Sequence, residues 1–171
     1  MKFELVVIPV TAVDRAKRFY SNLGWHCDID HSAASGLRIV QFTPPGSKSS
    51  IMFGTGITTA QPGSVQGLHL IVSDIEGVRT DLFGRGVEVS ELFHDPGGIF
   101  HRVGPEGRVS GANPGRKSYA SYASFSDPDG NGWVLQEVTA RLSADVEGSD
   151  ARFTPELLNA ALGVTTEALP A

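Results

Sequence analysis

Two βαβββ modules in one α+β chain are the fold that this sequence predicts. The first observation behind it is an internal repeat, in which residues 7–25 align with residues 69–87. Both copies consist of an apolar strand, an amphipathic helix and a glycine. The second observation is the content of 20 glycines and 10 prolines among 171 residues, without a short period. Such a content is typical of short strands joined by tight turns.

The first copy opens with an apolar run at residues 6–10, which predicts a strand covered on both faces. Apolar residues at helical spacing over 13–23 predict an amphipathic helix. Thr11 or Asp14 is expected to cap its start, and Gly24 to end it. Three further strands are expected at 25–30, 37–42 and 50–53.

The second copy repeats this order of elements. Ser73 and Glu76 fit the S-x-x-E capping box at the start of a helix that Gly86 would end. The segment DPDGN at 127–131 has proline and glycine at turn-favoured positions, and its carboxylates are expected to serve that turn. The strands expected after the helix are 87–93, 119–126 and 133–138.

The predicted domain organisation follows from the repeat. It comprises a first module at 1–56, a linker at 57–66, a second module at 67–140 and a tail at 141–171. Residues 94–118 of the second module are rich in glycine, and a loop of that length inside a domain is usually either a functional lid or disordered. A short helix is expected in the tail, opened by Thr154-Pro155-Glu156 and closed by Gly163.

Composition excludes several classes of function. The net charge of −5 contains no basic block, which argues against a nucleic-acid-binding surface. No run of about 18 apolar residues predicts a membrane span, and the N-terminal segment lacks the features of a signal peptide. Cys27 is the single cysteine, so an intrachain disulfide is impossible. The sequence therefore predicts a cytoplasmic protein.

Two motifs give the sequence a family resemblance. They are V-x-x-x-D-R-A-x-x-F-Y-x-x-L-G-W at 10–25 and D-P-D-G-N-x-W-x-L-Q-E at 127–137. With the doubled βαβββ order, they resemble the vicinal-oxygen-chelate superfamily, which holds glyoxalase I, bleomycin-resistance proteins and extradiol dioxygenases. The resemblance covers about residues 3–140. It implies cup-shaped mixed sheets around a cavity with the helices outside, paired within one chain or swapped in a homodimer.

The resemblance also implies where a divalent metal would bind. Enzymes of the superfamily usually hold it through His or Glu in the first and last strands of each module, and a catalytic ion needs about three protein ligands. The corresponding positions here are Leu5, Met52, Gly67 and Val134. None of these side chains is a plausible ligand, so no metal or other cofactor is predicted. A divalent metal is expected only if the protein is an enzyme with a non-standard site.

Other residues are candidates for contacting a ligand. Strand alternation places His69 on the side of Gly67, whereas Glu137 should face away from the cavity. His69 is either a hydrogen-bonded wall residue or a polar contact for a ligand. Gln41 and Gln136 either orient a ligand or lie at solvated edges. The expected lining comprises Leu5, Val7, Gln41, Met52, His69, Tyr122, Val134 and Gln136.

Three functions remain open at this stage. The favoured one is a metal-independent small-molecule-binding protein of the glyoxalase/bleomycin-resistance type, which protects against an antibiotic or a reactive metabolite. The alternative is an enzyme of the same superfamily, a lyase, isomerase or dioxygenase, with a non-standard metal site or with His69 as general base. The third is an interaction module that uses the tail helix.

Overall fold

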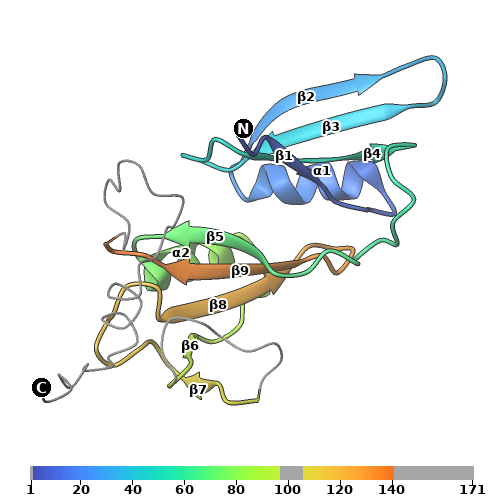
Figure 1. Cartoon of the computed structure of the whole chain (residues 1–171). Helices are drawn as coiled ribbons and strands as arrows, with labels where there is room; N and C mark the ends of the chain where they lie inside the picture. Colours follow the sequence, from blue (N-terminus) through green and yellow to red (C-terminus); the bar gives the residue numbers. More distant parts are fainter. Residues whose placement is uncertain (1, 97–105, 141–171) are drawn as a thin grey trace, which may run out of the picture. The chain divides into compact units, whose positions relative to one another are not determined.

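The computed structural model describes residues 2–96 and 106–140. Two parts of the sequence predictions lie outside the described residues, namely the tail helix and residues 97–105 of the glycine-rich segment. The predicted βαβββ order is confirmed for the first copy, and the second copy has four strands after its helix, two of them short (Figure 1). The helices are α1 (Val13–Asn22) and α2 (Ile75–Gly84).

Two mixed sheets make up the α+β fold. One has four strands in the order β1 (Leu5–Val7), β4 (Ser50–Thr55), β3 (Arg38–Thr43) and β2 (His26–Ser32). The other has five strands in the order β5 (Leu68–Val72), β9 (Gly132–Glu137), β8 (Ser121–Ser126), β6 (Phe93–His94) and β7 (Val109–Ser110). Within the first sheet, β1 and β4 are parallel, and the β2–β3 and β3–β4 pairs are antiparallel.

The chain forms two compact units, each with its own set of segments. The first unit comprises residues up to 68, residues 81–89 and residues 124–134. The described part of the second unit comprises residues 69–80, 90–96, 106–123 and 135–140. These units group residues by contact, whereas the repeat groups them by sequence order, so the boundaries at 57–66 stay a prediction.

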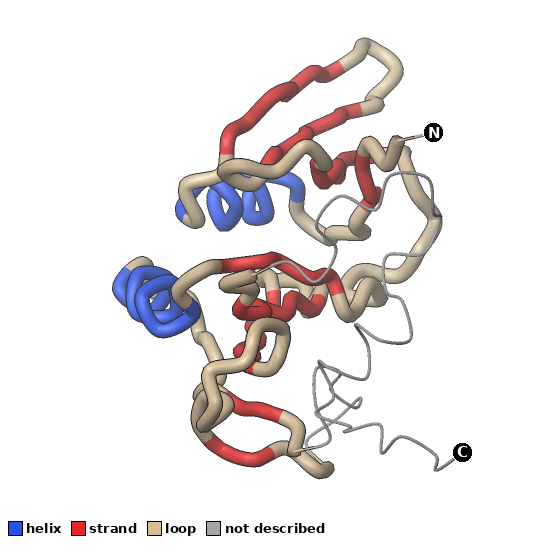
Figure 2. Tube along the Cα trace, turned by 60° about the vertical axis from the view of Figure 1, so that its left-hand side comes forward, coloured by secondary structure: helices blue, strands red, loops and turns tan. Residues whose placement is uncertain are grey.

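Helix α1 lies against one face of the four-stranded sheet in the first unit (Figure 2). Ala16 and Tyr20 on its inner side are fully buried. Because side chains alternate along a strand, every second residue of β3 and β4 faces the helix. These residues are Val40, Phe42, Ile51 and Phe53, all between 0% and 3% exposed. The sheet is therefore closed on its helix side by an apolar core.

Both helices end at the glycines that the sequence predicts. Gly24 and Gly86 each have a φ of +78°, a left-handed conformation that favours glycine. The N–H of Trp25 donates to the carbonyl oxygen of Tyr20 (3.3 Å), and the N–H of Val87 donates in the same way to Leu82 (3.0 Å). This six-residue closure satisfies carbonyl groups that the helix leaves open.

The predicted helix starts are wrong in both copies. The N-cap residue of α1 is Ala12, which makes no side-chain cap, while Thr11 is bound instead to Asp129. In the second copy the backbone N–H of Gly77 donates to Oδ1 of Asp74 (2.9 Å). Helix α2 begins one residue later than the capping box requires, so Glu76 is in its first turn and pairs with Arg116.

The predicted strand at 87–93 is also wrong. Its residues give only an isolated bridge between Val89 and Phe125 and the start of the short strand β6. A side chain competes for the backbone here, because Nε of Arg79 donates to the carbonyl oxygen of Ser90 (2.7 Å). Strand β6 pairs with β7, which lies in the segment expected to be a loop.

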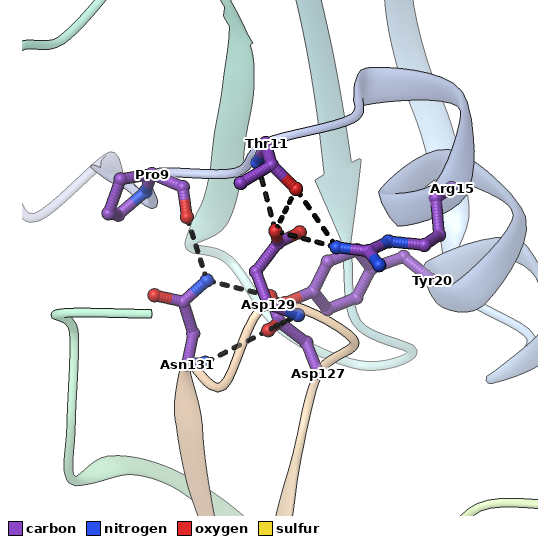
Figure 3. Close-up of polar contacts among 7 residues, drawn as sticks. All are labelled: Pro9, Thr11, Arg15, Tyr20, Asp127, Asp129 and Asn131. Carbon is purple, nitrogen blue, oxygen red and sulfur yellow. Dashed lines mark hydrogen bonds and ion pairs between the residues drawn. The ribbon is translucent and has the colours of Figure 1, made fainter. Parts of the chain in front are cut away.

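The turn between β8 and β9 holds a buried carboxylate in the first unit (Figure 3). Asp127 is 5% exposed, and its Oδ1 accepts the backbone N–H groups of Asp129 and Asn131 at 2.9 Å. Its Oδ2 accepts the Tyr20 hydroxyl (2.9 Å) and the Asn131 amide (2.8 Å). Burial and the charge of Asp127 raise the pKa of Tyr20 far above its usual range, so this hydroxyl remains a donor.

The same turn binds the segment that leads into α1. Asn131 is fully buried, and its Nδ2 donates to the carbonyl oxygen of Pro9 (3.0 Å). Asp129 accepts hydrogen bonds from the backbone of Thr11 (2.9 Å) and from Arg15 (2.8 Å). The turn residues that the sequence marks as local therefore join segments more than a hundred positions apart.

We expect Asn131→Ala to lower the free energy of unfolding by about 3 kcal/mol, because it leaves the carbonyl of Pro9 and the N–H of Val65 without their amide partner. Asn22→Ala is the matched control, since exposed Asn22 donates a single amide bond to Arg85 and should cost less than about 1 kcal/mol. Urea unfolding followed by the fluorescence of Trp25 and Trp133 measures both. Equal losses would contradict the central role of the turn.

A second pair of variants tests the packing of β4. A Cβ atom at Gly54 would lie 1.8 Å from the carbonyl oxygen of Arg38, so Gly54→Ala forces the backbone of β3 to move. We expect a loss of about 2 kcal/mol. At Gly84, near the end of α2, a Cβ atom would have no neighbour within 4 Å. Gly84→Ala should leave stability unchanged or raise it by up to about 1 kcal/mol in the same urea measurement.

Candidate functional site

The face of the four-stranded sheet opposite α1 carries four of the residues predicted to contact a ligand. Val7 pairs with Met52, and Met52 pairs with Gln41, so the three side chains lie in one row across the sheet. Leu5 is two residues before Val7 in β1 and shares its face. All four are partly exposed. We call this surface the open face.

A β-bulge adds a carboxylate to the open face. The register of β2 and β3 shifts between Cys27 and Ile29, so that Asp28 is the extra residue. Ile29 pairs with Gln41 and is 43% exposed. In a bulge the strand does not alternate, and the side chain of the extra residue is redirected. Asp28 therefore contacts side chains of the open face, although plain alternation would separate it from Ile29.

Hydrogen bonds join Asp28 to a polar row at one end of the open face. The Thr43 hydroxyl donates to Oδ2 of Asp28 (2.6 Å), and His26 Nδ1 lies 2.8 Å from its Oδ1. These bonds, the one from Thr43 foremost, hold the pKa of the Asp28 carboxyl below its usual value. Ser50 Oγ lies 2.7 Å from Thr43 Oγ1 and completes the row beside Leu5.

The other carboxylate of this strand lies on the opposite side of the sheet. Asp30 accepts two hydrogen bonds from Arg38 (3.0 and 3.1 Å) and one from Lys17 of α1 (2.7 Å). The bonds from Arg38, followed by the one from Lys17, hold the pKa of Asp30 well below its usual range. Asp30 fastens the helix to the sheet, whereas Asp28 is left among the polar groups of the open face.

The second unit brings together two other predicted residues. Gln136 donates through Nε2 to the Tyr122 hydroxyl (3.3 Å) and to the carbonyl oxygen of Tyr119 (3.0 Å). Tyr122 is fully buried, and burial raises its pKa to about 12. Its ring stacks on Phe93 at 5.6 Å between centroids, and the Arg108 guanidinium lies 4.0 Å above the Phe93 ring. Tyr122 and Gln136 thus support each other in a packed aromatic layer.

The remaining predicted residues are in different settings. His69 is exposed on β5, where Ile71 two residues later is 45% exposed. Val134 is 7% exposed on β9 in the first unit. Glu137, expected to face away from the ligand, is 1% exposed and accepts hydrogen bonds from Arg116 (2.9 Å) and from the N–H of Ile75 at the start of α2.

The donor set does not fit the metal centre that the superfamily implies. Leu5, Val134 and Gly67 offer no ligating side-chain atom, and the Met52 thioether suits soft ions rather than the usual divalent ones. Among residues 2–96 and 106–140, no three His, Cys, Asp or Glu side chains gather so that they could hold a metal ion. No reaction step through a metal is derived from these residues. Neither helix of the described ranges has the length and apolar character that crossing a bilayer requires.

Sequence reasoning missed Asp28, Thr43 and Ser50 as groups of the candidate site. Strand alternation could have identified Thr43 and Ser50, since each is two residues from a predicted contact residue in its own strand. For Asp28 no such signal existed. The bulge that redirects it is a feature of the pairing between two strands, and its position cannot be read from β2 alone.

Two comparisons with known proteins find nothing. No protein-family model matches the sequence, and no curated protein matches it.

Solved structures do match. A glyoxalase/bleomycin resistance protein from Streptomyces sp. CB03234 is 30% identical over 80% of this chain and 100% of its own, with a TM-score of 0.54. TnmS3, an antibiotic binding protein from the same organism, is 29% identical over 81% of this chain and 96% of its own, with a TM-score of 0.56. A member of the glyoxalase/bleomycin resistance protein/dioxygenase superfamily from Sphaerobacter thermophilus is 26% identical over 80% and 97%, with a TM-score of 0.58. The chain belongs to the glyoxalase/bleomycin resistance protein family.

Proposed function

We propose that the protein binds a small organic molecule on the open face without a metal ion and without chemical conversion. By withdrawing an antibiotic or a reactive metabolite from solution, it would protect the cell that makes it. The observation that carries the proposal is the residue content of the open face. Partly exposed apolar side chains lie beside a hydrogen-bonded polar row, and the metal-ligand positions hold no His or Glu residue.

This content is the one expected of a binding surface for an apolar compound. Transfer of an apolar ligand from water onto Leu5, Val7 and Met52 is favourable in proportion to the apolar area that is covered. A small number of fixed polar groups then sets the orientation of the ligand and its specificity. The row of Asp28, Thr43 and Ser50 supplies such groups, and its hydrogen bonds fix them before a ligand arrives.

The similar solved structures also support a binding function. TnmS3 is described as an antibiotic binding protein, and its identity of 29% extends over most of both chains. A fold of this family does not by itself decide between binding and catalysis. The absence of a His or Glu side chain at Leu5 and Met52 favours binding, because the enzymes that the family resemblance implies use those positions for a metal.

Two further parts of the proposal concern the state of the protein. We infer that it works as a homodimer, as the family resemblance implies, which light scattering coupled to size-exclusion chromatography measures directly. We also infer a cytoplasmic location, because a chain with one cysteine gains no disulfide from an oxidising compartment.

Isothermal titration against a panel of natural-product antibiotics tests the binding proposal. We expect saturable binding of at least one compound, and we expect its affinity to be unchanged after dialysis against EDTA. Met52→Asp should weaken binding more than about tenfold, because it places a charge where apolar area is covered. Phe83→Asp is the matched control, since Phe83 is 70% exposed on α2 outside the open face.

Two outcomes would contradict the proposal. Loss of binding in EDTA, together with a stoichiometric divalent metal in protein purified without a His tag, would establish a metal site. Conversion of the bound compound into a product would establish an enzyme. In that case His69→Ala would test the histidine of β5 as the general base.

A further inference from the structure

The polar row of the open face has a fixed hydrogen-bond direction, and Asp28 is its origin. An ionised carboxylate only accepts hydrogen bonds, so the single hydroxyl hydrogen of Thr43 is directed to Oδ2 of Asp28 at 2.6 Å. Thr43 Oγ1 can then only accept from Ser50 Oγ at 2.7 Å. The hydroxyl hydrogen of Ser50 is therefore committed to Thr43, and Ser50 in turn is an acceptor.

The side-chain amide of Gln41 is oriented by the same rule. Its Nε2 lies 3.4 Å from Oδ2 of Asp28 and 3.3 Å from Oγ of Ser50. Both partners are acceptors, so the nitrogen and not the oxygen of the amide must face them. The reverse orientation would place Oε1 against the carboxylate, which is repulsive. Both amide hydrogens are used in this way.

Oε1 is consequently the atom of Gln41 that remains for a ligand. The amide is planar, and its oxygen diverges from the nitrogen, so Oε1 points away from Asp28 and Ser50. On either side in its row stand the apolar residues Ile29 and Met52, with Val7 beyond Met52. A ligand whose apolar body covers those residues meets a hydrogen-bond acceptor and no free donor from Gln41.

We propose that the open face selects compounds that donate a hydrogen bond, through a hydroxyl or an amide N–H beside an apolar body, to Oε1 of Gln41. Asp28 is the positioning residue, because it fixes the direction in which the Gln41 amide points. This inference rests on the proposed function, since it names the chemical class of ligand for the same face. The inference goes beyond the proposed function because it makes Oε1 of Gln41 the hydrogen-bond acceptor and the ligand the donor.

A pair of matched probes tests the inference by isothermal titration. The probes are 2-naphthol, which has a hydroxyl donor, and 2-methoxynaphthalene, which has the same apolar body without the donor. We expect the wild-type protein to bind 2-naphthol about three- to tenfold more tightly, which is the range of one net hydrogen bond. Gln41→Met should abolish this preference and leave the affinity for 2-methoxynaphthalene unchanged within about twofold.

The positioning role of Asp28 is tested by the ratio of the two affinities. Asp28→Asn should bring the ratio close to one, because an asparagine amide can donate as well as accept and so permits both orientations of Gln41. Asp30→Asn is the matched control, since Asp30 is in the same strand but on the helix side with Lys17 and Arg38. It should keep the wild-type ratio, and thermal unfolding of both variants shows that they are folded.

Each contrary result has a separate meaning. Equal affinities of the wild-type protein for the two probes would overturn the inference while leaving apolar binding on the open face in place. Failure of both probes to bind, in a protein whose unfolding is normal, would count against the proposed function as well. A parallel loss of both affinities in Asp28→Asn, with the ratio unchanged, would show that Asp28 has only a structural role.

Discussion

The buried carboxylate of Asp127 is the constraint on which the first unit depends. A buried carboxylate is costly unless donors surround it, and here two backbone N–H groups, a hydroxyl and an amide do so. The hydroxyl belongs to Tyr20 on the inner side of α1, and the amide belongs to Asn131, which also binds Pro9. The hydrogen bonds of the Asp127 carboxylate are therefore complete only when the turn, α1 and the segment at Pro9 lie in this arrangement. Buried Ala16 and Tyr20 pack α1 on one face of the four-stranded sheet, and the opposite face is the partly exposed open face.

Asp127 and Asp28 follow the same physical rule in the first unit, although Asp127 is buried and Asp28 is exposed. Each is an acceptor-only group that forces the orientation of neighbouring hydroxyl and amide groups. At Asp127 the oriented groups are buried, so their effect is on stability. At Asp28 they lie on the partly exposed open face, where their proposed effect is on the groups that a ligand must offer. The difference comes from the bulge in β2, which directs Asp28 to the open face while Asp30 stays with Lys17 and Arg38.

The family supplies a scaffold that serves binding proteins and enzymes alike, so the fold cannot choose between them. The choice depends on which atoms stand at a few positions of the sheets. Leucine and methionine at 5 and 52 give the open face apolar area where the family resemblance implies metal ligands. The open face adds a glutamine amide, two hydroxyl groups and the Asp28 carboxylate beside His26. In the proposed function these groups orient a bound compound.

The sequence by itself determined the order of the elements in the first copy, the glycines that end both helices, and the alternation that puts Leu5 and Val7 on one side of β1. These features are local, because strand alternation and left-handed glycines depend on neighbouring residues. Tertiary structure decided the rest through partners that are distant along the chain or on another strand. Thr11 binds Asp129 and does not cap α1. The carbonyl oxygen of Ser90 accepts a hydrogen bond from Arg79 in place of a strand partner. Asp28 joins the open face only because β2 pairs with β3 through a bulge. A pairing irregularity and a long-range hydrogen bond leave no periodic signal in the sequence, so the polar half of the candidate site emerged only from the folded sheet.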